Sequence, residues 1–125
     1  IAVATLIFGG VLHRHPNIAI CLSHAGGTMT SLIGRFNRAC TKRPWVPEHL
    51  QYDGAFEESL QHLWFDTHVH DPRVLNWVID IMGTEKLLLG TNFAGWDQHA
   101  MTQDIEPDLA ASMAANAKRL LRVTS

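Results

Sequence analysis

Residues 63–90 read LWFDTHVHDPRVLNWVIDIMGTEKLLLG, and this stretch decides the fold class. A short apolar run at 63–67 is followed by Asp71 and Pro72, which are typical of the N-cap and the first position of a helix. Apolar residues then recur at helical spacing as far as a glycine, which favours a helix end. The next apolar run, 86–90, predicts a second strand, and a helical crossover of this length joins parallel strands.

The same alternation of strand and helix continues on both sides of this stretch. One further strand is predicted at 18–22, a continuous apolar run typical of a strand that is buried on both faces. Further helices are predicted at 2–12, 28–40, 55–61 and 107–121. About three parallel strands therefore alternate with helices in one domain, residues 1–125, and the fold class is α/β. Three strands do not close a (β/α)₈ barrel, which needs about 250 residues.

The composition is that of an ordinary globular domain, with 46% hydrophobic residues and a formal net charge of −2. Such a balance leaves no basic stripe for nucleic acid or for an anionic membrane surface. The longest apolar stretch, 1–12, is too short to span a membrane and lacks the flanks of a signal peptide. We therefore expect a small molecule as the partner, with no nucleic acid and no membrane.

The two cysteines and the start of the sequence lead to two further expectations, about the cellular compartment and about the extent of the chain. Cys21 and Cys40 are too few for a disulfide framework or a cysteine-rich zinc site, and Cys21 lies in an apolar run that favours a buried thiol. This usage favours a reducing, cytoplasmic location. The sequence starts without Met and within a helical pattern, so we expect a chain that extends further at this end.

Polar residues follow each predicted strand, and the reacting groups of parallel α/β folds gather at these carboxyl ends. The pairs to inspect are Ser23-His24, Thr67-His68 and Thr91-Asn92. His24 precedes Ala25-Gly26-Gly27, where the missing side chains let a ligand approach the backbone. His24 is therefore the candidate general acid or base, or a group that polarises a carbonyl or a metal-bound water.

Five short motifs occur together in an order that resembles a known family. They are Leu6-Ile-Phe-Gly-Gly-Val11, Ser23-His-Ala-Gly-Gly27, Gly34-Arg35, Val69-His-Asp-Pro72 and Leu89-Gly-Thr-Asn-Phe93. In this order and spacing they resemble the C-terminal part of amidohydrolase-superfamily barrels, closest to the branch of amino-carboxymuconate-semialdehyde decarboxylase. The resemblance covers almost the whole chain, and it implies that the three strands are the sixth, seventh and eighth of a TIM barrel.

The resemblance also implies roles for three residues. His24 matches the family's catalytic histidine, which lies beside a divalent metal, usually zinc, and its bound water. Arg35 looks like the arginine that reaches a neighbouring subunit's active site and helps to hold the substrate carboxylate, a task that suits a guanidinium fork. Asn92 matches the family's aspartate at the end of the last strand, which ligates the metal.

The residue at 92 departs from the family pattern. Asn92 offers one neutral oxygen, but it brings no charge to a dication and cannot accept a proton as a base. Asp97 in the same loop is interpreted as a solvated carboxylate, because ligands are normally placed by rigid strand ends. The family's other metal ligands would precede Ile1. We therefore expect that this chain alone holds no catalytic metal.

Two His-x-His pairs are alternative metal-ligand candidates. His13 and His15 lie at a helix end, where cationic side chains favourably meet the helix dipole. His68 and His70 look like the ligand pair of the first strand of an amidohydrolase barrel. Their context of a capped helix and a later Leu-Leu-Leu run belongs late in the barrel, which favours a structural interpretation as a strand end and a capped turn.

Two hypotheses about function remain open on the sequence. In the first, the chain carries part of the active site of a metal-dependent decarboxylase or hydrolase that acts on a small carboxylated substrate. His24 serves as the acid or base, and the substrate carboxylate binds Arg35. In the second, the chain is a truncated or degenerate homologue that acts only as a folded assembly module.

The incomplete barrel also predicts self-association. The inner apolar faces at 18–22, 63–65 and 87–89 would be uncovered without the remaining strands. We therefore expect a homodimer or a higher homo-oligomer.

Overall fold

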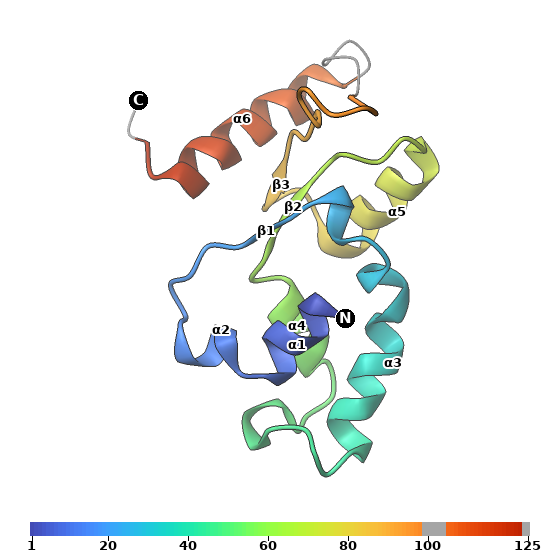
Figure 1. Ribbon diagram of the computed structural model, residues 1–125, viewed down its shortest axis with the longest axis vertical. Coiled ribbons are helices and arrows are strands. Elements are labelled where there is room, and N and C mark those ends of the chain that lie inside the picture. Colours follow the sequence, from blue (N-terminus) through green and yellow to red (C-terminus); the bar gives the residue numbers. More distant parts are fainter. Residues whose placement is uncertain (99–104, 124–125) are drawn as a thin grey trace. The chain divides into compact units, whose positions relative to one another are not determined.

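The computed structural model describes residues 1–98 and 105–123, and Figure 1 shows their helices and strands. The chain divides into two compact units. The first unit comprises Ile1–Ile20 and Thr28–Leu63, and the second comprises Cys21–Gly27 and Trp64–Ser125.

The second unit contains a small parallel sheet. Its strands are β1 (Cys21–Leu22), β2 (Trp64–Asp66) and β3 (Leu87–Leu88), in the order β1-β2-β3. The strands alternate with the 3-10 turn η1 (His24–Gly26) and the helices α5 (Pro72–Met82) and α6 (Pro107–Leu121). Both strand pairs are parallel, which confirms the predicted α/β class with three parallel strands.

The boundaries of α5 agree with the local signals in the sequence. The side chain of Asp71 accepts a hydrogen bond of 2.9 Å from the backbone N–H of Arg73, which would otherwise lack a partner in the first turn. The Arg73 guanidinium lies 2.6 Å from the same carboxylate. Gly83 ends the helix at φ 72°, a conformation that glycine adopts without the strain of a side chain.

The apolar residues of β2 and β3 are buried, which corrects the expectation of an open face at these strands, whereas Leu89, just beyond β3, is 40% exposed as expected. Phe65 is 2% exposed and packs against η1, where a side chain on Gly26 would lie 2.8 Å from the Phe65 ring. Leu87 is also 2% exposed, because α6 packs against β3. Contacts within the second unit thus bury much of the apolar face that was expected, from the sequence, to be exposed.

The strand predicted at 18–22 is shorter than expected. Only Cys21 and Leu22 pair, and they pair with β2 alone among the described strands. Ile18 is 43% exposed and the Cys21 thiol is exposed, so the predictions of a doubly buried strand and a buried thiol are wrong. The physical reason is that β1 lies at the edge of the described sheet and has a neighbour on one side.

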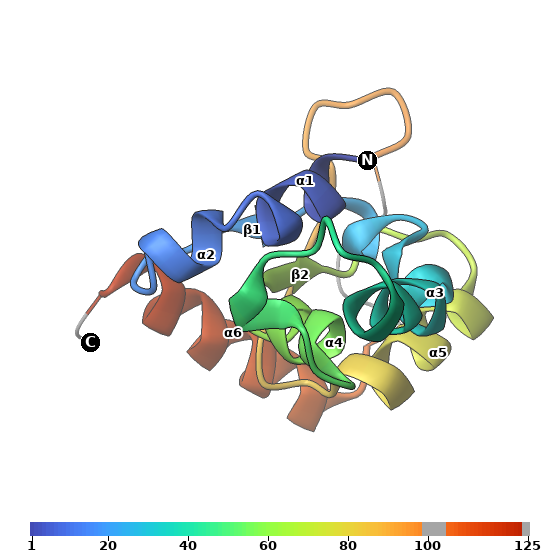
Figure 2. The same ribbon diagram turned by 90° about the horizontal axis from the view of Figure 1, so that it is seen from below.

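The first unit is helical. Its elements are α1 (Ala2–Phe8), α2 (Val11–Arg14), α3 (Met29–Lys42), the 3-10 turn η2 (Glu48–Leu50) and α4 (Ala55–Leu60). Helices α3 and α4 lie side by side, as Figure 2 shows. The core between the helices is aromatic: the buried Phe56 ring lies 4.6 Å from Phe36 and 5.4 Å from Phe8, centroid to centroid.

The helix predicted at 2–12 is broken into α1 and α2. Gly9 and Gly10 separate the two helices, and Gly10 has φ 71°, outside the right-handed helical region. Among the described residues, no helix combines the length and the apolar character that crossing a membrane would require.

Candidate active site at the strand ends

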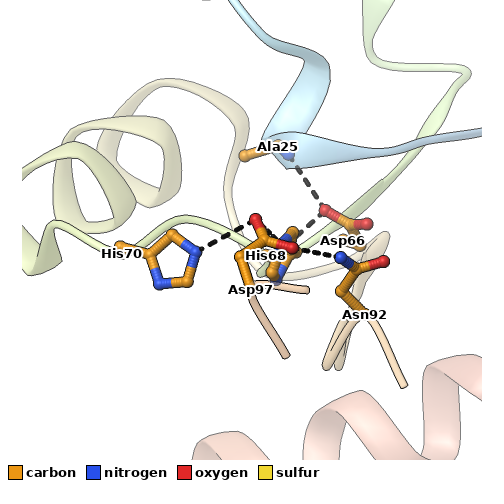
Figure 3. A network of polar contacts seen from close by, with 6 residues as sticks. All are labelled: Ala25, Asp66, His68, His70, Asn92 and Asp97. Atoms are coloured by element: carbon orange, nitrogen blue, oxygen red, sulfur yellow. Dashed lines mark hydrogen bonds and ion pairs between the residues drawn. The ribbon is translucent and has the colours of Figure 1, made fainter. Parts of the chain in front are cut away.

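The three strand ends predicted to carry the chemistry meet at one edge of the sheet, because all three strands run in the same direction. His24 follows β1, His68 and His70 follow β2, and Asn92 follows β3. All of these residues belong to the second unit. Figure 3 shows the polar network that His68, His70 and Asn92 form with Asp66, Asp97 and the backbone of Ala25.

Asp66, the last residue of β2, orders the backbone on both sides of the cluster. Its Oδ1 accepts hydrogen bonds from the backbone N–H of Ala25, at 3.0 Å, and from that of His68, at 3.1 Å (Figure 3). His24 and Ala25 both have positive φ, 53° and 52°, which costs energy for residues other than glycine. The hydrogen bond that the Ala25 N–H donates to Asp66 stabilises this turn and so positions His24.

The imidazole rings of three histidines lie next to one another. The ring centroids of His24 and His68 are 4.9 Å apart, and those of His68 and His70 are 5.0 Å apart. The His68 side chain is 3% exposed, whereas that of His70 is 55% exposed. The cluster therefore has a buried side at His68 and an open side at His70.

Asp97 joins His68 and His70 to Asn92. Its Oδ2 lies 3.2 Å from Nε2 of His68 and 3.4 Å from Nε2 of His70, and its Oδ1 accepts a hydrogen bond from the Asn92 amide (Figure 3). The Asp97 side chain is only 15% exposed. The interpretation of Asp97 as a solvated loop carboxylate is therefore wrong, because the loop after β3 returns it to the strand ends.

Electrostatics favour the charged form of Asp97. Partial desolvation raises the pKa of this carboxyl, but hydrogen bonds from the two histidines and the Asn92 amide outweigh it and lower the pKa to about 2. The carboxylate is therefore anionic at neutral pH, as a ligand for a cation must be.

Among the described residues, His68, His70 and Asp97 form the one group whose donor atoms could share a metal ion. One donor atom from each residue lies within 4.8 Å of the other two. Two imidazole nitrogens and one carboxylate oxygen form a donor set that suits zinc and similar divalent cations. The residues present thus fit the metal that the family resemblance implies.

The predicted metal ligand Asn92 lies in this cluster. Its amide N–H donates to Asp97, so in this arrangement Asn92 orients the carboxylate. Asn92 has φ 48° and starts a turn in which Gly95 N–H donates to its carbonyl, at 2.8 Å. Asparagine tolerates this left-handed conformation better than most residues.

Other predicted residues lie in the first unit. Arg35 is exposed on α3. The His13 ring stacks on that of His49, with centroids 4.1 Å apart, and His15 ends α2. Sequence reasoning missed Asp66 and undervalued Asp97. The position of Asp66 as the last residue of a strand was a usable signal, whereas no local pattern marked Asp97.

The residues 1–123 match the model of the family described as amidohydrolase. The chain belongs to the amidohydrolase family. It is 33% identical over 93 residues to 2-amino-3-carboxymuconate-6-semialdehyde decarboxylase of Dictyostelium discoideum, a match covering 74% of this chain and 26% of that protein. It is 32% identical over 94 residues to 6-methylsalicylic acid decarboxylase of Penicillium expansum, covering 74% of this chain and 28% of that protein.

Solved structures share the fold of this chain. The 5-carboxyvanillate decarboxylase from Sphingomonas paucimobilis superposes with a TM-score of 0.76 at 22% identity, covering 98% of this chain and 39% of that one. The strands and helices of this amidohydrolase-family chain therefore match part of a TIM barrel, as the resemblance implied. The chain spans about a quarter of the length of the curated relatives that it matches.

Proposed function

We propose that the protein carrying this chain is a metal-dependent decarboxylase of small carboxylated substrates, cyclic or unsaturated. The convergence of His24, His68 and Asp97 at the strand ends is the observation that carries the proposal. The names of its relatives, which are decarboxylases, support this reaction over hydrolysis. A divalent cation held by the cluster would bind the substrate's oxygens and stabilise the negative charge that develops on decarboxylation.

His24 is the proposed proton donor. When the bond between the substrate carbon and its carboxylate breaks, CO₂ leaves and the electron pair stays on that carbon. The protonated imidazole of His24 donates its proton there, and this general acid role contributes typically 10²–10⁴-fold to a rate. Asp66 positions His24 through the N–H of Ala25. Arg35 is proposed to hold the substrate carboxylate of a neighbouring subunit through bidentate hydrogen bonds.

The experiment measures CO₂ release by the full-length, zinc-loaded protein that carries these residues. Substrates are the acids of the relatives' names, 6-methylsalicylate and 5-carboxyvanillate, with ester and amide analogues to detect hydrolysis. We expect CO₂ release that falls at least 100-fold in His24→Gln. The matched control is His15→Gln, an exposed histidine of the first unit, and its activity is expected to equal the parent's. Equal activity in His24→Gln would refute the assigned role.

A non-catalytic assembly module is the second candidate function, and Asn92 in place of the family's aspartate is the observation that favours it. The same assay separates the two candidates. If no carboxylated, ester or amide substrate is turned over while the protein folds normally, the module is the better account.

We further propose that the protein is cytoplasmic and forms a homodimer. Both cysteines are free thiols, which fits a reducing compartment. An apolar groove of about 500 Å³ lies between β3 and α6 in the second unit, and its lining includes the buried Met113 and the exposed Leu121. Leu121 is 70% exposed. Sedimentation at micromolar concentration is expected to give a dimer that Leu121→Glu weakens, and a monomer would contradict the proposal.

A further inference from the structure

We propose that His68, His70 and Asp97 bind one divalent transition-metal cation within residues 1–125, without ligands from elsewhere. This inference deepens the proposed function, but it rests on geometry alone and does not require turnover. It also replaces the expectation from sequence that the chain by itself holds no metal.

The distances between the donor atoms match those around a tetrahedral zinc ion. Bonds of about 2.0–2.2 Å in tetrahedral geometry separate neighbouring donor atoms by about 3.4 Å. Nε2 of His68 and Nε2 of His70 lie 3.2 and 3.4 Å from Oδ2 of Asp97. One ligand atom from each of the three residues lies within 4.8 Å of the other two, so all three can face one cation.

Two of the ligands are held in place before a metal binds. His68 is buried against His24, and its backbone N–H is fixed by Asp66. Asn92 donates to Oδ1 of Asp97, which orients the carboxylate so that Oδ2 faces the two histidines. Such partners behind the ligands typically change metal affinity 10–100-fold. The side chain at 92 thus acts as a positioning residue for Asp97 in this chain.

The third ligand leaves the site open. His70 is 55% exposed, so the metal would be accessible to solvent from its side. Three protein ligands with a free fourth position are typical of catalytic zinc, where water or substrate completes the coordination. A purely structural site would instead be closed by a fourth protein ligand.

The test titrates the EDTA-treated chain with Co²⁺, whose visible absorption intensifies in tetrahedral sites, and then displaces the Co²⁺ with Zn²⁺. We expect one equivalent of Co²⁺ to bind and one equivalent of Zn²⁺ to remove the signal. Asp97→Asn and His68→Gln are expected to lower the affinity at least 10-fold. His70→Gln is expected to do the same, and because His70 is exposed this variant keeps the test sound if burial makes His68→Gln unfold.

The matched control is His49→Gln, an exposed histidine of the first unit that stacks on His13. Its Co²⁺ affinity is expected to equal the parent's. The inference would be overturned if Co²⁺ binding did not saturate, or if Asp97→Asn and His70→Gln left the Co²⁺ affinity unchanged. Metal binding without CO₂ release would refute only the proposed function, whereas CO₂ release with unchanged metal affinity in these variants would refute only the site.

Discussion

The Asp66 carboxylate accepts a hydrogen bond of 3.0 Å from the backbone N–H of Ala25, 41 residues earlier in the chain. This bond ties the end of β2 to the turn that carries His24. The same oxygen accepts from the N–H of His68. One carboxylate therefore positions both the proposed proton donor and a proposed metal ligand.

Replacement of Asp66 by Ala is expected to destabilise the chain by about 1–3 kcal/mol, because the buried Ala25 N–H loses its acceptor. Asp66→Asn keeps one acceptor oxygen and is expected to cost less. Urea unfolding followed by circular dichroism measures both. Asp80→Ala, at an exposed position of α5, is the control and should change stability by no more than about 0.5 kcal/mol. An equally small effect of Asp66→Ala would contradict the role given to this bond.

The position of the Asp66 side chain also requires a glycine at residue 90. A methyl group at Gly90 would lie 2.8 Å from Cβ of Asp66, closer than side chains approach one another. Gly90→Ala is therefore expected to cost about 1–3 kcal/mol through overpacking. Gly34→Ala provides the contrast, since Gly34 lies within α3 with open space around it and should gain about 0.5–1 kcal/mol. Thermal unfolding of both variants distinguishes them, and stabilisation by Gly90→Ala would be incompatible with the structure.

Asn116 connects α6 to β3 through its buried amide. Its Nδ2 donates to the carbonyls of Thr84 and Leu87, each at 2.8 Å. Asn116→Ala leaves both carbonyls without this donor, and we expect a loss of about 1–3 kcal/mol. The exposed Asn76→Ala on α5 is the matched control, with an expected change within about 0.5 kcal/mol. The denaturant midpoints of the two variants should differ clearly, and coincident midpoints would show that this amide is dispensable.

Features governed by neighbouring residues were predictable from the sequence. Asp71, Pro72 and Gly83 set the bounds of α5, because capping and left-handed conformations depend on the local chain. The parallel order of the strands also followed, because crossover length constrains it. His24 and Asn92 were selected by their positions at strand ends.

Features governed by distant contacts were not predictable in the same way. Ile18 continues an apolar run, but its exposure depends on which strands lie beside it. Asp97 is five residues beyond Asn92 in a loop, and its place between His68 and His70 depends on the path of that loop. Apolar periodicity carries no information about such a path, which explains why the sequence did not identify Asp97 as a member of the proposed metal site.

The histidine pair of the first unit predicts a pH dependence. Desolvation, and secondarily the charge of His13, lowers the pKa of His49 below its ordinary value of 6.5. A histidine with a lowered pKa in the folded state is protonated more readily when unfolded, so its contribution to stability is complete above pH 6.5 and is lost as the pH falls below that value. His13→Gln should raise the pKa of His49, which titration of the imidazole resonances by NMR would detect. An unchanged titration would show that the stacked ring of His13 has no electrostatic effect.

The most direct test of the proposed metal centre is the location of zinc in a crystal of the protein soaked with Zn²⁺, using anomalous diffraction at the zinc edge. A metal centre at the strand ends predicts one dominant peak, about 2.0–2.2 Å from Nε2 of His68, Nε2 of His70 and a carboxylate oxygen of Asp97. Asn92 should remain hydrogen-bonded to the other oxygen of Asp97. A zinc ion bound elsewhere, with these three side chains still contacting only one another, would contradict the claim that the strand ends form a metal centre.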